Sequence, residues 1–247
     1  MKAVILAAGY ATRLYPLTEN FPKPLLKIGD GTILGRLMDD ISAIPGIDSS
    51  IVVTNHRFAG IFREWAGAYP GVGILDDGST CNDNRLGAVK DLLLAVSTGE
   101  IDDDILVLAA DNILDFSLRG FVDFFRAKDA SCIMCHYEPS IKKLQRTGVV
   151  ALGEDSRVLQ MQEKPSEPVS HWAVPPFYIY ARHDLPLIKT AMDGGCGFDA
   201  PGNLAHYLVD KTAVYAWEMP GARFDIGSLD TYREAQLLFG GDNKIND

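Results

Sequence analysis

Residues 2–26 read KAVILAAGYATRLYPLTENFPKPLL, an apolar run that passes directly into a loop of small residues and cations. The run from 2 to 7 is continuously apolar rather than alternating, which is typical of a strand buried on both faces of a parallel sheet. Open α/β sheets bind their ligands outside the carboxyl ends of the strands. The loop after this strand is therefore predicted to lie at a ligand-binding edge.

This loop has the composition of a phosphate-binding segment. Small side chains at 7–9 and 11 leave backbone N–H groups open to an anion. Arg13 suits a two-point grip on phosphate, and Lys23 adds a point charge between two prolines. Gly9 alone does not supply the three spaced glycines of a dinucleotide-binding motif. An ordinary surface loop with solvated cations is the competing interpretation, but small residues and two cations after a first strand favour phosphate binding.

The first half of the chain alternates strand-like and helix-like segments. The strand-like segments cover 2–7, 50–54, 72–75, 104–109 and 130–136, and the helix-like segments cover 32–43, 58–68, 86–96 and 117–127. Alternation of this kind indicates βαβ units. The predicted fold class is therefore α/β, with a mostly parallel, doubly wound sheet.

The pattern changes after residue 143. Segments 148–152 and 158–162 flank a polar turn and predict an antiparallel hairpin. The later segments are expected to form a strand at 173–181, helices at 183–192 and 203–211, a strand at 214–217, a closing helix at 229–239 and a flexible tail at 240–247.

The overall composition restricts the classes of partner. The formal net charge is −10 over 247 residues, which disfavours general binding to nucleic acid because that needs a basic face. No apolar run reaches membrane-spanning length, so no membrane partner is expected. The four cysteines do not suggest a disulfide framework, and a cytoplasmic location is the simplest expectation.

Two aspartates stand out as candidate metal ligands. Asp111 follows the strand at 104–109, at the edge of the sheet where ligands bind. Asp225 lies in a predicted turn before the last helix, far along the chain. Mg2+ prefers oxygen ligands and commonly takes one or two carboxylates together with substrate phosphates. Taken alone, either aspartate could instead serve as a turn or helix-capping residue.

The motif L-A-A-G-Y-A-T-R-L-Y-P-L-T, followed by P-K-P, resembles the signature of the sugar-1-phosphate nucleotidyltransferases, including the glucose-1-phosphate thymidylyltransferase type. The resemblance continues to about Tyr232. It implies a Rossmann-like nucleotidyltransferase fold with an antiparallel substrate-side part. It also implies a single domain at 1–239, with a nucleotide-binding half at 1–136 and an acceptor-binding half at 137–239.

The resemblance also implies roles for particular residues. Arg13, Lys23 and Asp111 would be catalytic, and Asp111 and Asp225 would hold Mg2+. Relatives carry a glycine where this chain has Ala110, and a Trp/Phe-x-Asp-x-Gly-Thr element that here ends with Ser228 in place of the threonine. The implied nucleotide-binding residues are Ala7, Ala8, Gly9, Tyr10, Ala11, Thr12, Arg13, Lys23, Asn84 and Gly87.

The acceptor side is marked by Glu163 and Lys164, in a Glu-Lys-Pro element that ends the predicted hairpin. In relatives the lysine contacts the acceptor's phosphate and the glutamate a sugar hydroxyl. An exposed charged turn is the alternative interpretation. The aromatic residues at 172–180 could pack in the core or form part of a cage for a quaternary ammonium group.

The implied reaction transfers a nucleoside monophosphate from a nucleoside triphosphate (dTTP, UTP or CTP) to a sugar 1-phosphate, releasing pyrophosphate. The expected partners are thus a nucleoside triphosphate and a small phosphorylated acceptor, and a homo-oligomer is compatible with the sequence. A cytidylyltransferase for a non-sugar phosphate or phosphonate, such as phosphocholine, is the first alternative. A nucleotide-sensing protein of the same fold without turnover is the second.

Overall fold

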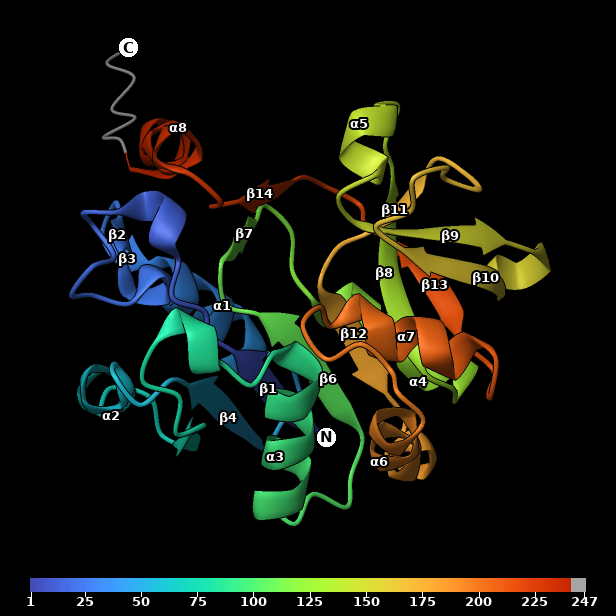
Figure 1. Cartoon of the computed structure of the whole chain (residues 1–247), viewed down its shortest axis with the longest axis horizontal. Helices are drawn as coiled ribbons and strands as arrows, with labels where there is room; N and C mark the ends of the chain where they lie inside the picture. Colours follow the sequence, from blue (N-terminus) through green and yellow to red (C-terminus); the bar gives the residue numbers. More distant parts are fainter. Residues whose placement is uncertain (241–247) are drawn as a thin grey trace.

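The computed structural model describes residues 1–240, so the tail predicted at 240–247 lies, apart from Gly240, outside the described residues. One sheet runs through the molecule in the strand order β10-β9-β11-β8-β12-β6-β1-β4-β5 (Figure 1). Its parallel part consists of β1 (Lys2–Leu6), β4 (Ser49–Thr54), β5 (Val72–Asp76) and β6 (Ile105–Ala109). The carboxyl ends of these four strands therefore meet at one edge, as the sequence predicted.

The other part of the sheet is mainly antiparallel. It contains β8 (Cys132–Tyr137), β9 (Gly148–Leu152), β10 (Val158–Glu163), β11 (Trp172–Val174) and β12 (Phe177–Tyr180), with β13 (Tyr215–Glu218) running parallel to β8. β9 and β10 form the predicted antiparallel hairpin. The α/β fold class and the antiparallel substrate-side part are thus confirmed.

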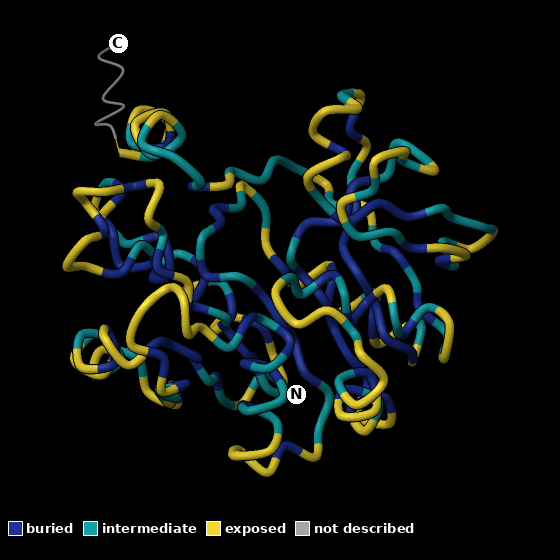
Figure 2. The backbone as a smooth tube through the Cα atoms, viewed as in Figure 1, coloured by how far each residue is buried: buried dark blue, intermediate teal, exposed yellow. Residues whose placement is uncertain are grey.

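Helices cover both faces of the sheet (Figure 1). The described residues form the helices α1 (Ile33–Ser42), α2 (Ala59–Ala66), α3 (Ala88–Thr98), α4 (Arg119–Lys128), α5 (Ile141–Leu144), α6 (Pro186–Asp193), α7 (Gly202–Val209) and α8 (Leu229–Phe239). Of these, α8 lies apart from the large sheet (Figure 1). Adjacent strand residues face opposite layers: Ile5 packs in the core beneath α1 and α4, whereas Val4 packs in the core beneath α3, α6 and α7. Figure 2 shows the strands buried between these layers.

The segment at 173–181 does not form the single strand that was predicted. It splits into β11, which pairs with β8 and β9, and β12, which pairs with β6 and β8. Pro175 and Pro176 lie between them, and proline cannot donate a backbone N–H to a ladder. The Pro176 carbonyl instead accepts from Ala109 N at 3.2 Å, which joins this break to the end of β6.

The sequence did not predict several short strands. The strands β7 (Asn112–Leu114) and β14 (Arg223–Asp225) form a separate antiparallel ribbon, and β2 (Lys27–Ile28) pairs with β3 (Gly31–Thr32). In Figure 1, the chain passes through β14 on its way to α8. Pieces of two or three residues are too short to show a hydrophobic period. The β7–β14 ribbon brings the two predicted metal ligands together.

Side-chain hydrogen bonds cap the N-termini of α1 and α8. The hydroxyl of Thr32 accepts a hydrogen bond from Gly35 N at 2.9 Å and so caps α1. Ser228 caps α8 in the same way, with Thr231 N donating to its hydroxyl at 3.2 Å. No helix in the described range 1–240 is long and apolar enough to cross a membrane.

Candidate active site

The predicted phosphate loop and the first predicted metal ligand meet at the carboxyl edge of the sheet. Lys23 Nζ donates to Asp111 Oδ2 at 2.7 Å and to the carbonyl oxygen of Ile226 at 3.0 Å. The Lys23 side chain is 13% exposed, so this ion pair is largely shielded from water. A shielded ammonium group beside a carboxylate is suited to bind a charged ligand at this edge.

Asp225 completes the pair of carboxylates. The β7–β14 register places Asp225 directly opposite Asn112, the residue after Asp111. Asn112 Nδ2 donates to Asp111 Oδ1 at 2.7 Å and holds that carboxylate in place. Partial desolvation raises the pKa of Asp225, whose side chain is 56% exposed, and the nearby negative charge of Asp111 raises it further. Two carboxylates that repel each other in this way favour a bound cation.

The donor set fits Mg2+. Both candidate ligands offer hard carboxylate oxygens, and Mg2+ requires no more than one or two of them when substrate phosphates complete its coordination. Within residues 1–240, no group of three or more His, Cys, Asp or Glu side chains is placed to hold a metal ion by itself. This arrangement suits a cation that binds together with a phosphorylated substrate.

The phosphate loop is fixed by hydrogen bonds on both sides. Ala11 adopts left-handed backbone angles (φ 47°, ψ 42°), and its carbonyl accepts from Thr18 Oγ1 at 2.8 Å. The hydroxyl of Tyr10 donates to the Ser79 carbonyl at 2.9 Å. Ala7 N donates to Val53 O at 2.8 Å and so continues the sheet. The loop is therefore held in one shape before a ligand arrives.

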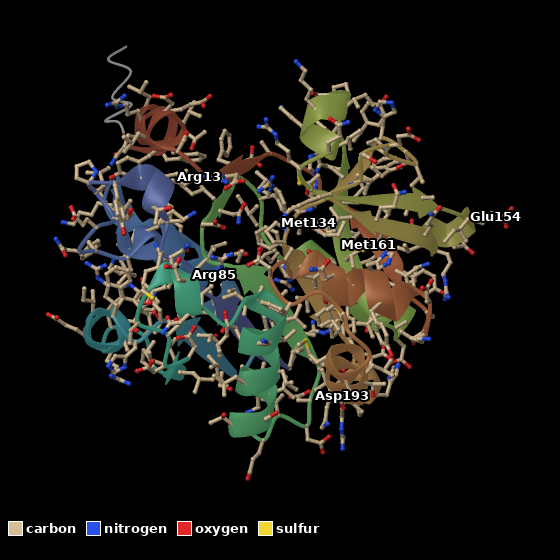
Figure 3. All side chains as sticks on the ribbon, viewed as in Figure 1. Arg13, Arg85, Met134, Glu154, Met161 and Asp193 are labelled. Atoms are coloured by element: carbon tan, nitrogen blue, oxygen red, sulfur yellow. The ribbon has the colours of Figure 1, made fainter. Side chains whose placement is uncertain are left out.

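The remaining loop candidates lie near the two carboxylates or face open space. Thr12 and Arg13 belong to a short 3-10 helix, Thr12–Leu14. The Arg13 charge lies close enough to Asp225 to act on its pKa, which it lowers slightly against the larger raising effects of desolvation and Asp111. Figure 3 shows Arg13 on the side of the molecule that carries the first half of the chain. A Cβ atom on Gly9 would meet no heavy atom within 4 Å, so open space faces this position.

A cavity of about 680 Å3 adjoins the carboxylate pair. Asp111, Asn112 and Asp225 line one part of it, and Arg146 and Arg223 line another. Arg223 Nη1 donates to Asn112 Oδ1 at 2.5 Å and lies 3.7 Å from Asp225 Oδ2. The sequence analysis did not assign a role to either arginine. Arg223 stands where relatives carry an aromatic residue, and that departure was the signal that could have identified it.

Glu163 and Lys164 lie beside this cavity rather than in its lining. Lys164 N donates to the carbonyl of Thr147, a lining residue, at 3.1 Å, and Lys164 Nζ lies 3.9 Å from Glu163 Oε1. Burial raises the pKa of Glu163. Its carboxylate fills the space over Gly202, where an added Cβ atom would lie 2.0 Å from Glu163 Oε2. Glu163 lines a neighbouring cavity of about 630 Å3 with Asn203 and His206.

A smaller cavity of about 190 Å3 lies at the other end of the phosphate loop. Gly9 and Gly87 both line it, so the structure brings these two predicted residues together. Gly87 has φ 92°, and an added Cβ atom would lie 2.7 Å from the Phe198 carbonyl oxygen. Asn84 is used differently: its Oδ1 accepts from the backbone N–H groups of Thr80 and Cys81, both at 3.0 Å. Its side chain shapes the loop and does not line the cavity.

The aromatic residues at 172–180 do not surround an open pocket. Phe177, Tyr178 and Tyr180 are all at most 3% exposed, and the rings of Tyr178 and Tyr180 stack at 5.8 Å between centroids. Trp172 packs edge-to-face against Tyr137. Among the described residues that line the large cavity, Phe224 supplies the one phenyl ring.

The cysteines at 132 and 135 also pack as the strand alternation predicts. Cys132 lies in the core beneath α1 and α4, and Cys135 lies in the core on the other face of the sheet. Burial raises the pKa of both thiols to about 12. They are structural apolar residues, not a metal or redox pair.

Comparisons with known proteins place the chain in a family. The sequence model of the family described as nucleotidyl transferase matches residues 2–239. A UTP–glucose-1-phosphate uridylyltransferase from Haloferax volcanii is 27% identical over 245 residues, which cover 96% of this chain and 95% of that protein.

Solved structures share the fold. A putative glucose-1-phosphate thymidylyltransferase from Bacillus anthracis, crystallised with sucrose, superimposes with a TM-score of 0.80 at 24% identity, covering 98% of this chain and 96% of that one. A UDP-glucose pyrophosphorylase complexed with UDP-glucose gives a TM-score of 0.79 at 18% identity, covering 96% and 97%. At these identities the structural likeness supports the fold.

Proposed function

The chain belongs to the nucleotidyl transferase family, and on this premise we propose that it transfers a nucleoside monophosphate from dTTP, UTP or CTP to a sugar 1-phosphate. The products would be pyrophosphate and a nucleoside diphosphate sugar. The observation that carries the proposal is the Lys23–Asp111 ion pair beside Asp225, at the mouth of a large cavity. This arrangement supplies positive charge and candidate metal ligands where a triphosphate and a second phosphate can meet.

The reaction needs little from the protein beyond positioning and charge. A phosphate oxygen of the sugar phosphate is ionised at neutral pH and attacks the α-phosphorus, forming one P–O bond while the bond to the pyrophosphate leaving group breaks. No general base is required. Arg13 and Lys23 would bind the triphosphate, neutralise its charge and align the α-phosphorus with the attacking oxygen.

Asp111 and Asp225 would hold Mg2+ together with the substrate phosphates. Bound there, Mg2+ would offset the charge that develops on the phosphate oxygens. Lys23 would then exchange its bond to Asp111 for one to the triphosphate. The Ile226 carbonyl, 3.0 Å from Lys23 Nζ, can keep the ammonium group in position during that exchange.

Each half of the chain would bind one of the two substrates. We assign the nucleotide to residues 1–136 and the acceptor to 137–239. Lys164 would bind the acceptor phosphate, Glu163 a sugar hydroxyl, and Arg146 and Arg223 would add positive charge along the cavity wall. The buried rings at 172–180 support a sugar over a quaternary ammonium acceptor, since a choline group favours open aromatic faces.

A pyrophosphate-release screen tests the proposal. It crosses UTP, dTTP, CTP, ATP and GTP with a panel of sugar 1-phosphates, phosphocholine and a phosphonate, each with Mg2+. We expect turnover with a pyrimidine nucleotide and a sugar 1-phosphate. Turnover with phosphocholine alone would assign the protein to the cytidylyltransferase alternative, and the absence of turnover with every pair would reject the proposed reaction.

A further inference from the structure

A buried carboxyl group forms part of the smaller cavity. Asp91 lies in the first turn of α3, is 4% exposed, and lines the cavity together with Gly9 and Gly87. Its Oδ1 atom is buried without a hydrogen-bond partner among the hydrogen bonds of the described chain. The sequence analysis gave this residue no role. A buried carboxyl oxygen without a protein donor needs either a neighbouring proton or a ligand to satisfy it.

Asp91 is paired with a second aspartate, Asp77, which follows β5 and is 9% exposed. Their side chains lie within hydrogen-bonding reach of each other, and burial together with the charge of Asp77 raises the pKa of Asp91 to about 7. Two ionised carboxylates cannot form a hydrogen bond, so below about pH 7 a proton lies between them. The Ser79 backbone N and hydroxyl both donate to Asp77 Oδ1 at 2.7 Å, which fixes the orientation of the Asp77 carboxyl group.

The shared proton determines what Asp91 offers to the cavity. The Asp91 carboxyl donates its proton to Asp77, so its other oxygen can only accept a hydrogen bond. The nearest backbone donors are already engaged: Ala88 N bonds to the Asp199 carbonyl at 3.4 Å and Val89 N to the Phe198 carbonyl at 3.0 Å. Arg85, the cation in the lining, is held by Asp199 at 2.9 Å. The Asp91 carboxyl group therefore offers the cavity a hydrogen-bond acceptor.

We propose that Asp91, held by Asp77, accepts the N3–H of a uracil or thymine base and so selects these bases over cytosine. This inference rests on the proposed function, because it takes the smaller cavity as the nucleoside end of that site. Uracil and thymine carry a hydrogen on N3, where cytosine carries a lone pair that an acceptor oxygen would repel. A site built to accept from an N–H group rejects an analogue that lacks it, since a buried polar group is then left unpaired.

The competing interpretation is that the two aspartates only fasten the loop after β5 to α3. Nucleotide binding without acceptor separates the two interpretations. Isothermal titration calorimetry with UTP, dTTP, CTP and GTP, each with Mg2+, measures affinity independently of turnover. We expect the wild-type protein to bind UTP or dTTP at least about tenfold more tightly than CTP, as expected for one hydrogen bond to a buried acceptor. Equal or tighter binding of CTP or GTP would overturn the proposal.

Two substitutions make the test specific to the acceptor oxygen. Asp91→Asn keeps a carbonyl oxygen and donates an amide N–H to Asp77, so it should retain UTP affinity within about threefold and keep the base preference. Asp91→Ala removes the acceptor and should weaken UTP binding by about 5- to 150-fold while changing CTP binding much less. Asp123→Asn, an exposed position on α4, serves as the matched control for a lost carboxylate.

The outcomes distinguish this inference from the proposed function. If Asp91→Ala weakens UTP and CTP binding equally while circular dichroism shows an intact fold, the aspartates are structural and the inference fails. If Asp91→Ala does not fold, the base preferences of the wild-type protein and of Asp91→Asn still decide between base recognition and a purely structural role. A clear preference for UTP or dTTP, with no pyrophosphate released from any acceptor, would leave the base assignment standing and reject the transferase reaction.

Discussion

The ammonium nitrogen of Lys23 lies 2.7 Å from a carboxylate oxygen of Asp111, so the phosphate loop and the end of β6 share one charged contact. The contact joins a residue expected to bind triphosphate to a residue expected to bind metal. Without a ligand, the Lys23 ammonium group and the Asp111 carboxylate bind each other, so neither is free for its expected partner. On the proposed mechanism Lys23 would leave Asp111 as metal and phosphate enter, and the substitutions below separate these contributions.

Removal of either carboxylate should abolish metal-dependent turnover. We expect Asp111→Asn and Asp225→Asn each to reduce the rate by about a hundredfold or more, because metal-based charge stabilisation is worth several kcal/mol. EDTA should stop the wild-type reaction and excess Mg2+ should restore it. Pyrophosphate release measures the rate, and thermal unfolding checks the fold. A variant with a near-normal rate would remove that aspartate from the site.

The lysines at 23 and 164 should affect different substrates. Lys23→Ala should weaken nucleotide use, and Lys164→Ala should weaken use of the phosphorylated acceptor. A charge-assisted hydrogen bond contributes about 1.5–3 kcal/mol, which corresponds to losses of roughly ten- to over a hundredfold in kcat/KM. Steady-state kinetics with each substrate varied in turn would show the division. An unchanged KM and rate for the acceptor in Lys164→Ala would contradict the acceptor assignment.

A sugar acceptor should depend on Glu163 more than on the ring of Trp172. Glu163→Ala removes a possible partner for a sugar hydroxyl and should raise the acceptor KM by about tenfold or more. Trp172→Ala removes an edge-to-face contact with Tyr137 and should leave the acceptor KM within about threefold. Because Glu163 is largely buried, Glu163→Gln, which keeps its volume, should be compared with Glu163→Ala. The reverse order of effects would favour a choline-like acceptor.

Asp91 makes stability depend on pH with a defined sign. Its folded-state pKa of about 7 exceeds the ordinary value of 3.8, so the folded protein holds a proton that the unfolded chain releases between these values. The stabilisation of the folded state by this proton is fully present below about pH 4 and is lost as the pH rises through 7. The loss approaches about 4 kcal/mol, from three pKa units at 1.36 kcal/mol each.

Asp91→Asn should therefore stabilise the protein more at pH 8 than at pH 5, relative to wild type. Denaturant unfolding of both proteins at the two pH values measures the difference. Asp123→Asn should show no such dependence, since Asp123 is more than half exposed. A stabilisation that is equal at both pH values would show that Asp91 titrates normally in the folded protein.

The sequence predicted the parts of the site that are local. The apolar run at 2–7, the small loop residues and the aspartate after 104–109 each show their role through immediate neighbours, and the structure places them at one edge. The closing helix at 229–239 matches α8 residue for residue, since its capping and apolar spacing are also local.

Contacts between distant segments could not be predicted in the same way. Nothing in three residues around Asp225 indicates that they pair with the segment after Asp111, and this pairing depends on the packed sheet. Arg146 looks like an ordinary charged residue until the fold turns it toward the large cavity. Asn84 has a side chain suited to bind a ligand, but its Oδ1 atom accepts hydrogen bonds from backbone N–H groups of its own loop.

The pairing of β14 with β7 also bears on the order in which the protein matures during synthesis. A ribosome releases the strand that carries Asp111 long before it releases Asp225, and N-terminal segments generally fold first. The parallel strands can therefore assemble while the site still lacks its second carboxylate. α8 then docks on the first half, with Tyr232 Oη donating to the Lys27 carbonyl at 2.7 Å. On the proposed assignment, competence for metal binding would thus require the later-made segment, which carries Asp225, to close over a framework that is already formed.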